Sequence, residues 1–273
     1  MSEPTVYDAA AIGAYDLISS MLPPGSGLAA WVSSQRPLTG RSVLDLGAGT
    51  GVSSFALADA GAQVVTVDAS RPSLDRLGSK RGDRKVDAVE ADFRDLRLDS
   101  TSDVVTLSRN TFFLAQSHDE KIGLLRTVGR HLKPGGAAFL DCTDPAEYLR
   151  ADGDATSVTY PLGREHLVTT TQNADRAAQA VMSVFMVQSA SALTAFHEVA
   201  TRATLPEIRL LARIAGLEVT AVNGSYAGDD YTARSREMLV VLEAKWPLFL
   251  SLRPRARPSR WATPRCWSRR PSR

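Results

Sequence analysis

Three glycines and one carboxylate, close to a short apolar segment, are the residues of this chain best suited to ligand chemistry. Val43–Leu46 predicts a strand that contains Asp45, and Gly47, Gly49 and Gly51 alternate directly after it. Glycine lacks a Cβ atom and adopts backbone angles that other residues disfavour, so a ligand can lie against the main chain. A helix that begins near Gly51 would direct free N–H groups to the same place. These features predict a ligand site in which Asp45 favours a cation or an ammonium group over a pyrophosphate.

The spacing of the glycines separates two classes of ligand. A dinucleotide site needs Gly-x-Gly-x-x-Gly, in which the third glycine lets the helix pack closely. Gly47 and Gly49 would place that third glycine at position 52, where the chain has Val52. The pattern here is Gly-x-Gly-x-Gly after an acid. A nicotinamide-dependent dehydrogenase is therefore a less favoured alternative, and a glycine-rich turn without any ligand is a further one.

A second acid stands at the end of the next predicted strand. Gln63–Asp68 is rich in β-branched residues, and Asp68 lies 21 positions after Gly47. A carboxylate at this place can accept hydrogen bonds from both hydroxyls of an adenosine ribose, with Ala69 beside it. Nicotinamide enzymes place an acid in the same way, so this feature does not discriminate. Asp68 could alternatively cap the following helix, unless Ser70 takes that role.

The third and fourth predicted strands also end in residues suited to binding. Residues 86–93 alternate in polarity and finish at Asp92 and Phe93, and an aromatic face there can stack on a flat ring. Residues 103–113 run from an apolar strand into a polar and then aromatic loop. The residues of that loop that could meet a ligand or a substrate are Ser108, Arg109, Asn110, Phe112 and Phe113. Each of the two phenylalanines could equally serve only the core.

Together these segments resemble the class I S-adenosylmethionine-dependent methyltransferases. In that family the glycine turn passes under the methionine and ribose parts of the cofactor, and the first acid helps to hold its amino end. The acid after the third strand meets the adenine, and the loop after the fourth lies beside the reactive methyl group. The resemblance implies S-adenosylmethionine as the cofactor. The binding residues that it implies are Asp45, Gly47, Ala48, Gly49, Gly51, Asp68, Ala69, Asp92, Phe93, Ser108 and Arg109.

Three further segments narrow the resemblance, which covers residues 1 to about 244. Ser108–Gln116, Asp141–Glu147 and Gly224–Gly228 are similar to the cypemycin-type methyltransferases of linaridin peptide biosynthesis. Those enzymes dimethylate the α-amino group at the N terminus of a modified peptide, so the resemblance implies a peptide amine as the acceptor. Two alternatives stay open, a methyltransferase that acts on nitrogen or oxygen of a small metabolite and a binding protein that has lost turnover.

Methyl transfer from a sulfonium is an in-line displacement and asks little acid–base chemistry of the protein. The cofactor supplies the electrophile and the leaving group, and the enzyme contributes alignment and dehydration. An amine must arrive unprotonated, but a strong general base is not mandatory. The weak candidates for that role are Tyr15, Asn110, His197 and Glu198. The sequence contains no catalytic triad pattern and no metal-ligand cluster, so we expect no metal.

The order of the predicted elements indicates an α/β fold, a Rossmann-like class I methyltransferase sheet with helices on both faces. Strands and helices alternate over residues 41–142, which predicts parallel pairing with right-handed crossovers. Residues 155–204 instead predict antiparallel strands. We interpret this insertion as a substrate cover above the carboxyl ends of the main strands, where ligands bind in open α/β folds. Only about half of its polar and aromatic residues can face the pocket; the candidates are Tyr160, Arg164, His166, Phe196, His197, Glu198 and Arg202, with Tyr226 from a later loop.

The predicted domain organisation places this cover inside a methyltransferase domain of residues 41–245. Residues 1–40 are predicted to form a helical lid, in which an amphipathic stretch over residues 7–22 ends at Pro23-Pro24-Gly25. Tyr7, Tyr15 and Asp16 are unusually polar for a helix that only packs, so this helix either folds over the cofactor or covers the edge of the sheet.

Length and composition agree with an enzyme of this size. The chain has 273 residues and is 44% hydrophobic, which is enough for one substantial core. No apolar run approaches membrane-spanning length, and the first residues lack the regions of a secretion signal. Cys142 and Cys266 offer neither a disulfide framework nor zinc spacing. These observations predict a cytoplasmic protein without a membrane partner.

Residues 246–273 differ in composition from the rest of the chain. They contain eight arginines and no acid, which leaves 24 basic and 30 acidic residues, a formal charge of −6, on the first 245. That balance argues against a nucleic-acid partner. Without any helical or strand period, the Arg/Pro-rich tail is predicted to be a disordered extension, and a basic arm for RNA or acidic lipid is the alternative. The oligomeric state does not follow from the sequence.

Overall fold

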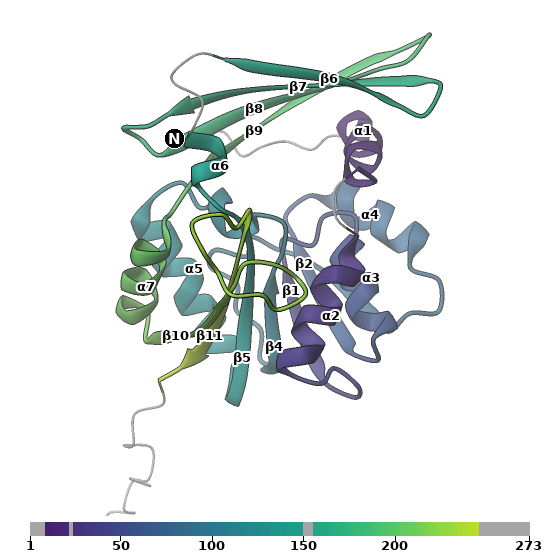
Figure 1. Cartoon of the computed structure of the whole chain (residues 1–273). Coiled ribbons are helices and arrows are strands. Elements are labelled where there is room, and N and C mark those ends of the chain that lie inside the picture. The colour runs from purple at the N-terminus through teal and green to yellow at the C-terminus, as the bar shows by residue number, and fades with distance from the viewer. Residues whose placement is uncertain (1–8, 22–23, 150–154, 246–273) are drawn as a thin grey trace, which may run out of the picture.

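The computed structural model describes residues 9–21, 24–149 and 155–245, so Tyr7 and the predicted tail lie outside the described residues. Its main body is a seven-stranded sheet in the order β10-β11-β5-β4-β1-β2-β3 (Figure 1). The strands are β1 (Ser42–Leu46), β2 (Gln63–Asp68), β3 (Val86–Glu90), β4 (Ser102–Leu107), β5 (Leu132–Thr143), β10 (Leu217–Asn223) and β11 (Glu237–Ala244). All neighbours pair in parallel except β11, which is antiparallel to both β5 and β10.

Helices pack on both faces of this sheet because its buried strands alternate their apolar side chains. Val43 of β1 joins a core cluster with Trp31 and Leu57, whereas Leu44 joins a cluster on the opposite face with Leu124. The helices are α1 (Ala9–Ser19), α2 (Gly25–Gln35), α3 (Val52–Asp59), α4 (Arg71–Lys80), the 3₁₀ turn η1 (Thr111–Leu114), α5 (His118–His131), α6 (Ala146–Leu149) and α7 (Leu205–Ile214). This architecture confirms the predicted fold class.

Local signals fix where the helices begin. The hydroxyl of Ser117 accepts a hydrogen bond from the backbone N–H of Glu120 at the start of α5. A capping box between Thr204 and Glu207 begins α7. None of the helices among the described residues is both long and apolar enough to cross a membrane.

The predicted insertion forms a separate antiparallel sheet in the order β6-β7-β8-β9, which we call the cover sheet. Its strands are β6 (Thr156–Leu162), β7 (His166–Asp175), β8 (Ala180–Gln188) and β9 (Leu193–Thr201). The cover sheet is drawn at the top of Figure 1, with α1 beneath one part of it. Ala14 and Ile18 of α1 pack there against Val168, Val187 and Phe196.

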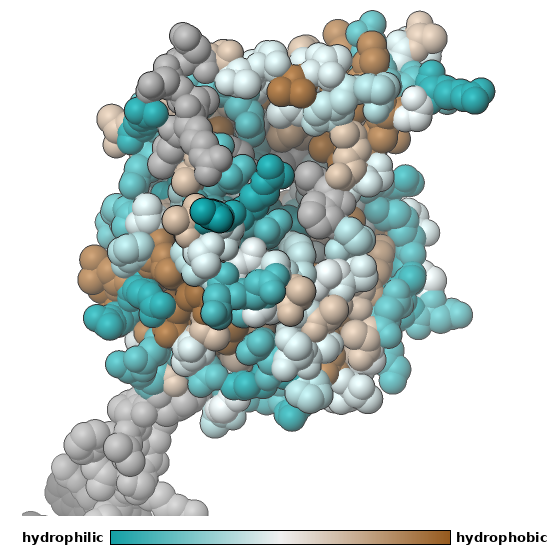
Figure 2. Space-filling model, viewed as in Figure 1, coloured by the Kyte–Doolittle hydropathy of each residue, from teal (hydrophilic) through white to brown (hydrophobic). Residues whose placement is uncertain are grey.

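Several apolar side chains stay exposed on the surface. Leu167, Met182 and Leu193 of the cover sheet are 46%, 45% and 65% exposed, and Leu210 and Ile214 protrude from α7. Figure 2 shows apolar side chains over the cover sheet and over α7. Single exposed apolar residues are common on soluble proteins, so these do not define a site.

A buried junction joins the cover sheet to the main body. The carbonyl oxygen of Ala115 accepts hydrogen bonds from Thr201 Oγ1, at 3.0 Å, and from the ammonium group of Lys121. Lys121 is 1% exposed, and burial lowers its pKa to about 8. The guanidinium of Arg202 lies 5.0 Å from the centre of the Phe113 ring.

Phe112 and Phe113 are fully buried in the core, so the expectation that one of them lines the substrate side of the site is wrong.

Candidate functional site

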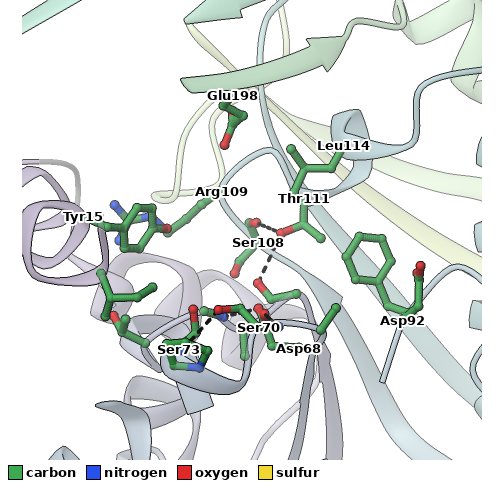
Figure 3. A pocket seen from close by; sticks show the side chains of 18 of the residues that line it. Tyr15, Asp68, Ser70, Ser73, Asp92, Ser108, Arg109, Thr111, Leu114 and Glu198 are labelled. Carbon is green, nitrogen blue, oxygen red and sulfur yellow. Dashed lines mark hydrogen bonds between the residues drawn. The ribbon is translucent and has the colours of Figure 1, made fainter. Parts of the chain in front are cut away.

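A cavity of about 720 Å³ lies between the carboxyl ends of the main strands and the cover sheet (Figure 3). Residues from α1, the glycine turn, the start of α4, the loops after β3 and β4, and β9 line it. The predicted residues that it brings together are Tyr15, Gly47, Ala48, Gly49, Asp68, Ala69, Asp92, Phe93, Ser108, Arg109, His197 and Glu198.

The three glycines of the turn have positive φ angles of 69°, 55° and 92°, but each meets different surroundings. A Cβ atom on Gly47 would lie 2.4 Å from a methyl group of Thr111, so this glycine permits a close approach of two loops. A Cβ atom on Gly49 would meet nothing nearer than Tyr15 at 3.8 Å, and Gly49 lines the cavity. Gly51 would collide with Phe55 and Leu77 and does not line the cavity. The expectation that Gly51 contacts the ligand is therefore replaced by a packing role.

Asp45 lies beneath the floor of the cavity rather than on its wall. The side chain is fully buried, and its two oxygens accept hydrogen bonds from Ser54 Oγ at 2.6 Å and Thr106 Oγ1 at 2.7 Å. Burial raises the pKa of Asp45 to about 6, although the two hydroxyls oppose that shift. The prediction that Asp45 contacts the cofactor directly is therefore wrong. Its two carboxylate oxygens instead face the hydroxyls of Ser54 on α3 and Thr106 on β4.

Asp68 fixes the glycine turn through its carboxylate. Its Oδ2 accepts the N–H of Gly49 at 2.8 Å, and its Oδ1 accepts the N–H of Ser70 at 2.8 Å. Ser70 in turn caps α4 by accepting the N–H of Ser73, so Asp68 is not the cap of that helix. A carboxylate has about four acceptor positions, and two therefore stay available for a ligand.

Asp92 and Phe93 form the end of the cavity opposite Tyr15, as Figure 3 shows for Asp92. Both oxygens of Asp92 accept hydrogen bonds from the guanidinium of Arg94, and Oδ1 also accepts the backbone N–H of Arg94. These bonds hold the pKa of Asp92 below its usual value. Phe93 adds an apolar surface to the same end.

Arg109 and Asn110 adopt left-handed backbone angles, with φ of 54° and 69°, which are unusual for residues other than glycine. Asp141 holds this backbone, because its carboxylate accepts the N–H of Arg109 and its carbonyl accepts the N–H of Asn110. The side chain of Asn110 exchanges hydrogen bonds with Thr143 and does not line the cavity. Asn110 is therefore a loop anchor rather than a candidate base.

Helix α1 contributes Tyr15 to the cavity and anchors itself through Asp16. Burial raises the pKa of Tyr15, while the positive charge of Arg109 opposes that shift. Asp16 accepts hydrogen bonds from Thr50 Oγ1, Arg76 Nε and Lys80 Nζ at 2.6, 2.7 and 2.9 Å. Although burial opposes it, these bonds keep the pKa of Asp16 below its usual value. Asp16 thus fastens α1 to the glycine turn and to α4.

Only two predicted residues of the cover, His197 and Glu198, line the cavity. The others serve elsewhere. Phe196 packs against α1, the hydroxyl of Tyr226 donates to Asp141 at 2.9 Å, and Arg202 is buried beside Phe113. Tyr160, Arg164 and His166 also lie off the cavity wall. Strand alternation predicted that some would face away, and their contacts with α1, Phe113 and Asp141 show which ones do.

The sequence did not predict fourteen of the residues that line the cavity. They are Ile12, Thr50, Val52, Ser53, Ser70, Arg71, Pro72, Ser73, Glu90, Arg94, Thr111, Leu114, Gln116 and Val199, of which only Thr50, Ser70, Arg94 and Gln116 lie outside the helices and strands. Ser70 to Ser73 directly follow Asp68, so proximity to the ribose acid was an available signal. Gln116 had none, because its amide reaches the carbonyl of Val199 across 83 positions of sequence. The described residues include no group of three or more His, Cys, Asp or Glu arranged for a metal ion.

Comparisons with known proteins match both the glycine turn and nearly the whole chain. A family model for a methyltransferase domain matches residues 43–136. The cypemycin N-terminal methyltransferase of a Streptomyces species is 75% identical over 243 residues, which are 89% of this chain and 99% of that protein. The CcbJ methyltransferase from Streptomyces caelestis superposes with a TM-score of 0.75 at 30% identity, over 81% of this chain and 90% of that one. S-adenosylmethionine-bound CalS10, an amino pentose methyltransferase from Micromonospora echinaspora, shares the fold at 21% identity with a TM-score of 0.61, over 80% of this chain and 89% of that one.

Proposed function

The chain belongs to the S-adenosylmethionine-dependent methyltransferases, and we propose that it methylates the N-terminal α-amino group of a ribosomally made natural-product peptide, once or twice. The observation that carries this proposal is the 75% identity that extends over 99% of the cypemycin N-terminal methyltransferase. A match of that length spans both the glycine turn and the cover sheet, so it supports a shared acceptor as well as a shared donor.

The residues along the cavity fit the donor. Gly49 leaves its main chain open, Asp68 keeps acceptor positions free for two ribose hydroxyls, and Phe93 offers an apolar face for adenine. We infer that Gly47, Ala48 and Gly49 lie under the amino-acid part, with Ala69 beside the ribose and Ser108 near the sulfur. When bound, the donor supplies the electrophilic methyl group and a neutral leaving group.

The cover sheet supplies the side chains nearest to an incoming amine. Glu198 and His197 of β9 line the cavity together with Leu114 and Thr111 of η1. The amine must present a free lone pair, and the carboxylate of Glu198 can orient it and accept its proton. Tyr15 is less suited to accept a proton, because its raised pKa keeps the hydroxyl protonated near neutral pH. It can donate a hydrogen bond instead.

A mass-spectrometric assay tests the acceptor. The full-length protein is incubated with S-adenosylmethionine and a synthetic peptide whose N terminus is free, and in parallel with the same peptide after N-acetylation. We expect mass gains of 14 and 28 Da on the free peptide, located on its first residue, and none on the acetylated one. Equal methylation of the acetylated peptide, or methylation only of hydroxyl compounds, would contradict the proposal and move the assignment to a side-chain or O-methyltransferase.

A further inference from the structure

Arg109 differs from the other arginines that line the cavity. Arg71 pairs with Asp75 and Glu90, and Arg94 pairs with Asp92. The two terminal nitrogens of Arg109, Nη1 and Nη2, are buried and donate no hydrogen bond to any residue that the structure describes. A buried cation without hydrogen-bond partners is strongly disfavoured, and such a group is usually matched by an anion.

The backbone of Arg109 is fixed in a way that keeps this side chain at the cavity. Its left-handed φ of 54° is held by the hydrogen bond from its N–H to the carboxylate of Asp141, at 3.0 Å. The same carboxylate accepts the hydroxyl of Tyr226, which ties the loop after β10 to this point. Strained backbone that neighbouring elements hold in place is common where a side chain must be aimed at a ligand.

The order of side chains along the cavity indicates which anion Arg109 meets. Figure 3 shows Asp92 at one end, Asp68 in the middle, and Arg109 beside Tyr15 at the other end. A donor with its adenine near Asp92 and its ribose on Asp68 extends its amino-acid part across Gly49 toward Arg109. That part carries one carboxylate, and the planar guanidinium fork matches a carboxylate with two parallel hydrogen bonds.

We propose that Arg109 is the receptor for the α-carboxylate of the methyl donor, which it binds through Nη1 and Nη2. Asp141 is then a positioning residue that acts through the backbone of Arg109. The pairing neutralises the arginine charge next to the place where a sulfonium must bind, and it selects donors that keep their carboxylate. The proposal depends on the donor and not on the peptide acceptor.

Isothermal calorimetry with two demethylated ligands tests the proposal without any turnover. One ligand is S-adenosyl-L-homocysteine, and the other is its decarboxylated analogue, which keeps the amine. For the wild-type protein we expect the analogue to bind roughly 10- to 100-fold more weakly, as for the loss of a charge-assisted hydrogen-bonded pair. In Arg109→Met this preference falls below about threefold, because S-adenosyl-L-homocysteine loses affinity and the analogue does not.

The matched control is Arg71→Met, which removes the same charge from the same cavity but from an arginine that already has carboxylate partners. It should keep the wild-type preference. Binding of 5′-methylthioadenosine, which lacks the amino-acid part, reports whether Arg109→Met retains a folded adenosine site.

Three results would overturn the proposal. They are a wild-type protein that binds both ligands equally, an Arg109→Met variant that binds both ligands with wild-type affinity, and an Arg109→Met variant that binds both ligands more weakly by the same factor. The second would assign Arg109 to an acidic group of the acceptor, and the third would assign it to the shape of the pocket. The first needs no variant, so the test holds even if Arg109→Met does not fold. The calorimetric test contains no peptide, so a failed peptide assay would not change the affinities that it measures.

Discussion

The floor of the cavity and the cover above it hold their functional residues by different means. On the floor, Gly49 presents bare main chain, and Asp68 is fixed by two backbone N–H groups. In the cover, His197 and Glu198 are adjacent side chains on β9, which is an edge strand and is only partly buried. A floor made of main chain tolerates few substitutions, whereas side chains on an edge strand can change without altering the fold. We therefore expect donor recognition to depend on the floor and acceptor choice to depend on the cover.

The largest effect should come from filling the floor at Gly49. In Gly49→Val the new side chain occupies the space over the turn, where no atom lies within 3.8 Å of an added Cβ, and we expect it to abolish measurable binding of S-adenosyl-L-homocysteine. Gly40→Val is the matched control, because Gly40 has a similar positive φ of 73° and an added Cβ there meets nothing within 4 Å. Both variants should lose about 1–3 kcal/mol of stability from backbone strain. Calorimetric binding by Gly49→Val would show that the floor is not where the donor lies.

The second effect concerns the acid under the floor and depends on pH. Burial raises the pKa of Asp45 to about 6, so between pH 4 and 6 the folded protein keeps a proton that the unfolded chain loses. As the pH rises from 4 to 6, the free energy of unfolding of the wild type should therefore fall relative to that of Asp45→Asn. The expected difference is roughly 2–3 kcal/mol, since each pKa unit is worth about 1.4 kcal/mol. Urea unfolding of both proteins at several pH values measures the difference. Parallel curves for the two proteins would mean that Asp45 titrates normally.

Asp45 also shows what the sequence could and could not predict about the floor. The apolar segment, the alternating glycines and the acids at strand ends were enough to predict a parallel sheet and to place Asp68 at the end of its second strand. Whether Asp45 meets a ligand depended on Ser54 and Thr106, hydroxyls on α3 and β4 that reach its two oxygens. Local spacing does not encode such contacts between elements.

The cover shows the same limit more strongly. The prediction of antiparallel strands over residues 155–204 matches β6 to β9, which span residues 156–201, because β-branched residues and turns are local signals. Of the residues predicted as candidates to face the cavity, His197 and Glu198 reach it, whereas Phe196 turns to α1. Tyr226 was likewise expected at the pocket and instead bonds Asp141. Side-chain direction on an edge strand depends on what packs against it.

The third effect tests the cover directly. In Glu198→Gln the side chain keeps its shape and loses its charge. We expect kcat/KM for the peptide to fall about tenfold, which is less than the loss of an essential acid–base group would cause, because the amine needs no strong general base. Affinity for S-adenosyl-L-homocysteine should stay within about twofold, since the donor is held by the floor. Glu165→Gln, on the exposed turn between β6 and β7, is the control and should leave both quantities unchanged. An equal loss of donor affinity in Glu198→Gln would contradict the division between floor and cover.

The smallest effect tests the element that connects the two regions. Helix α1 packs under the cover sheet through Ile18 and is fastened to the floor by Asp16, which accepts bonds from Thr50, Arg76 and Lys80. We expect Asp16→Asn to weaken S-adenosyl-L-homocysteine about three- to fivefold, mainly through faster dissociation in stopped-flow measurements, because partly exposed ion pairs contribute only about 0.2–1 kcal/mol each. Asp59→Asn breaks an exposed pair with Arg84 away from the cavity and should not change dissociation. If Asp16→Asn dissociates at the wild-type rate, α1 only packs against the cover and does not act as a lid over the donor.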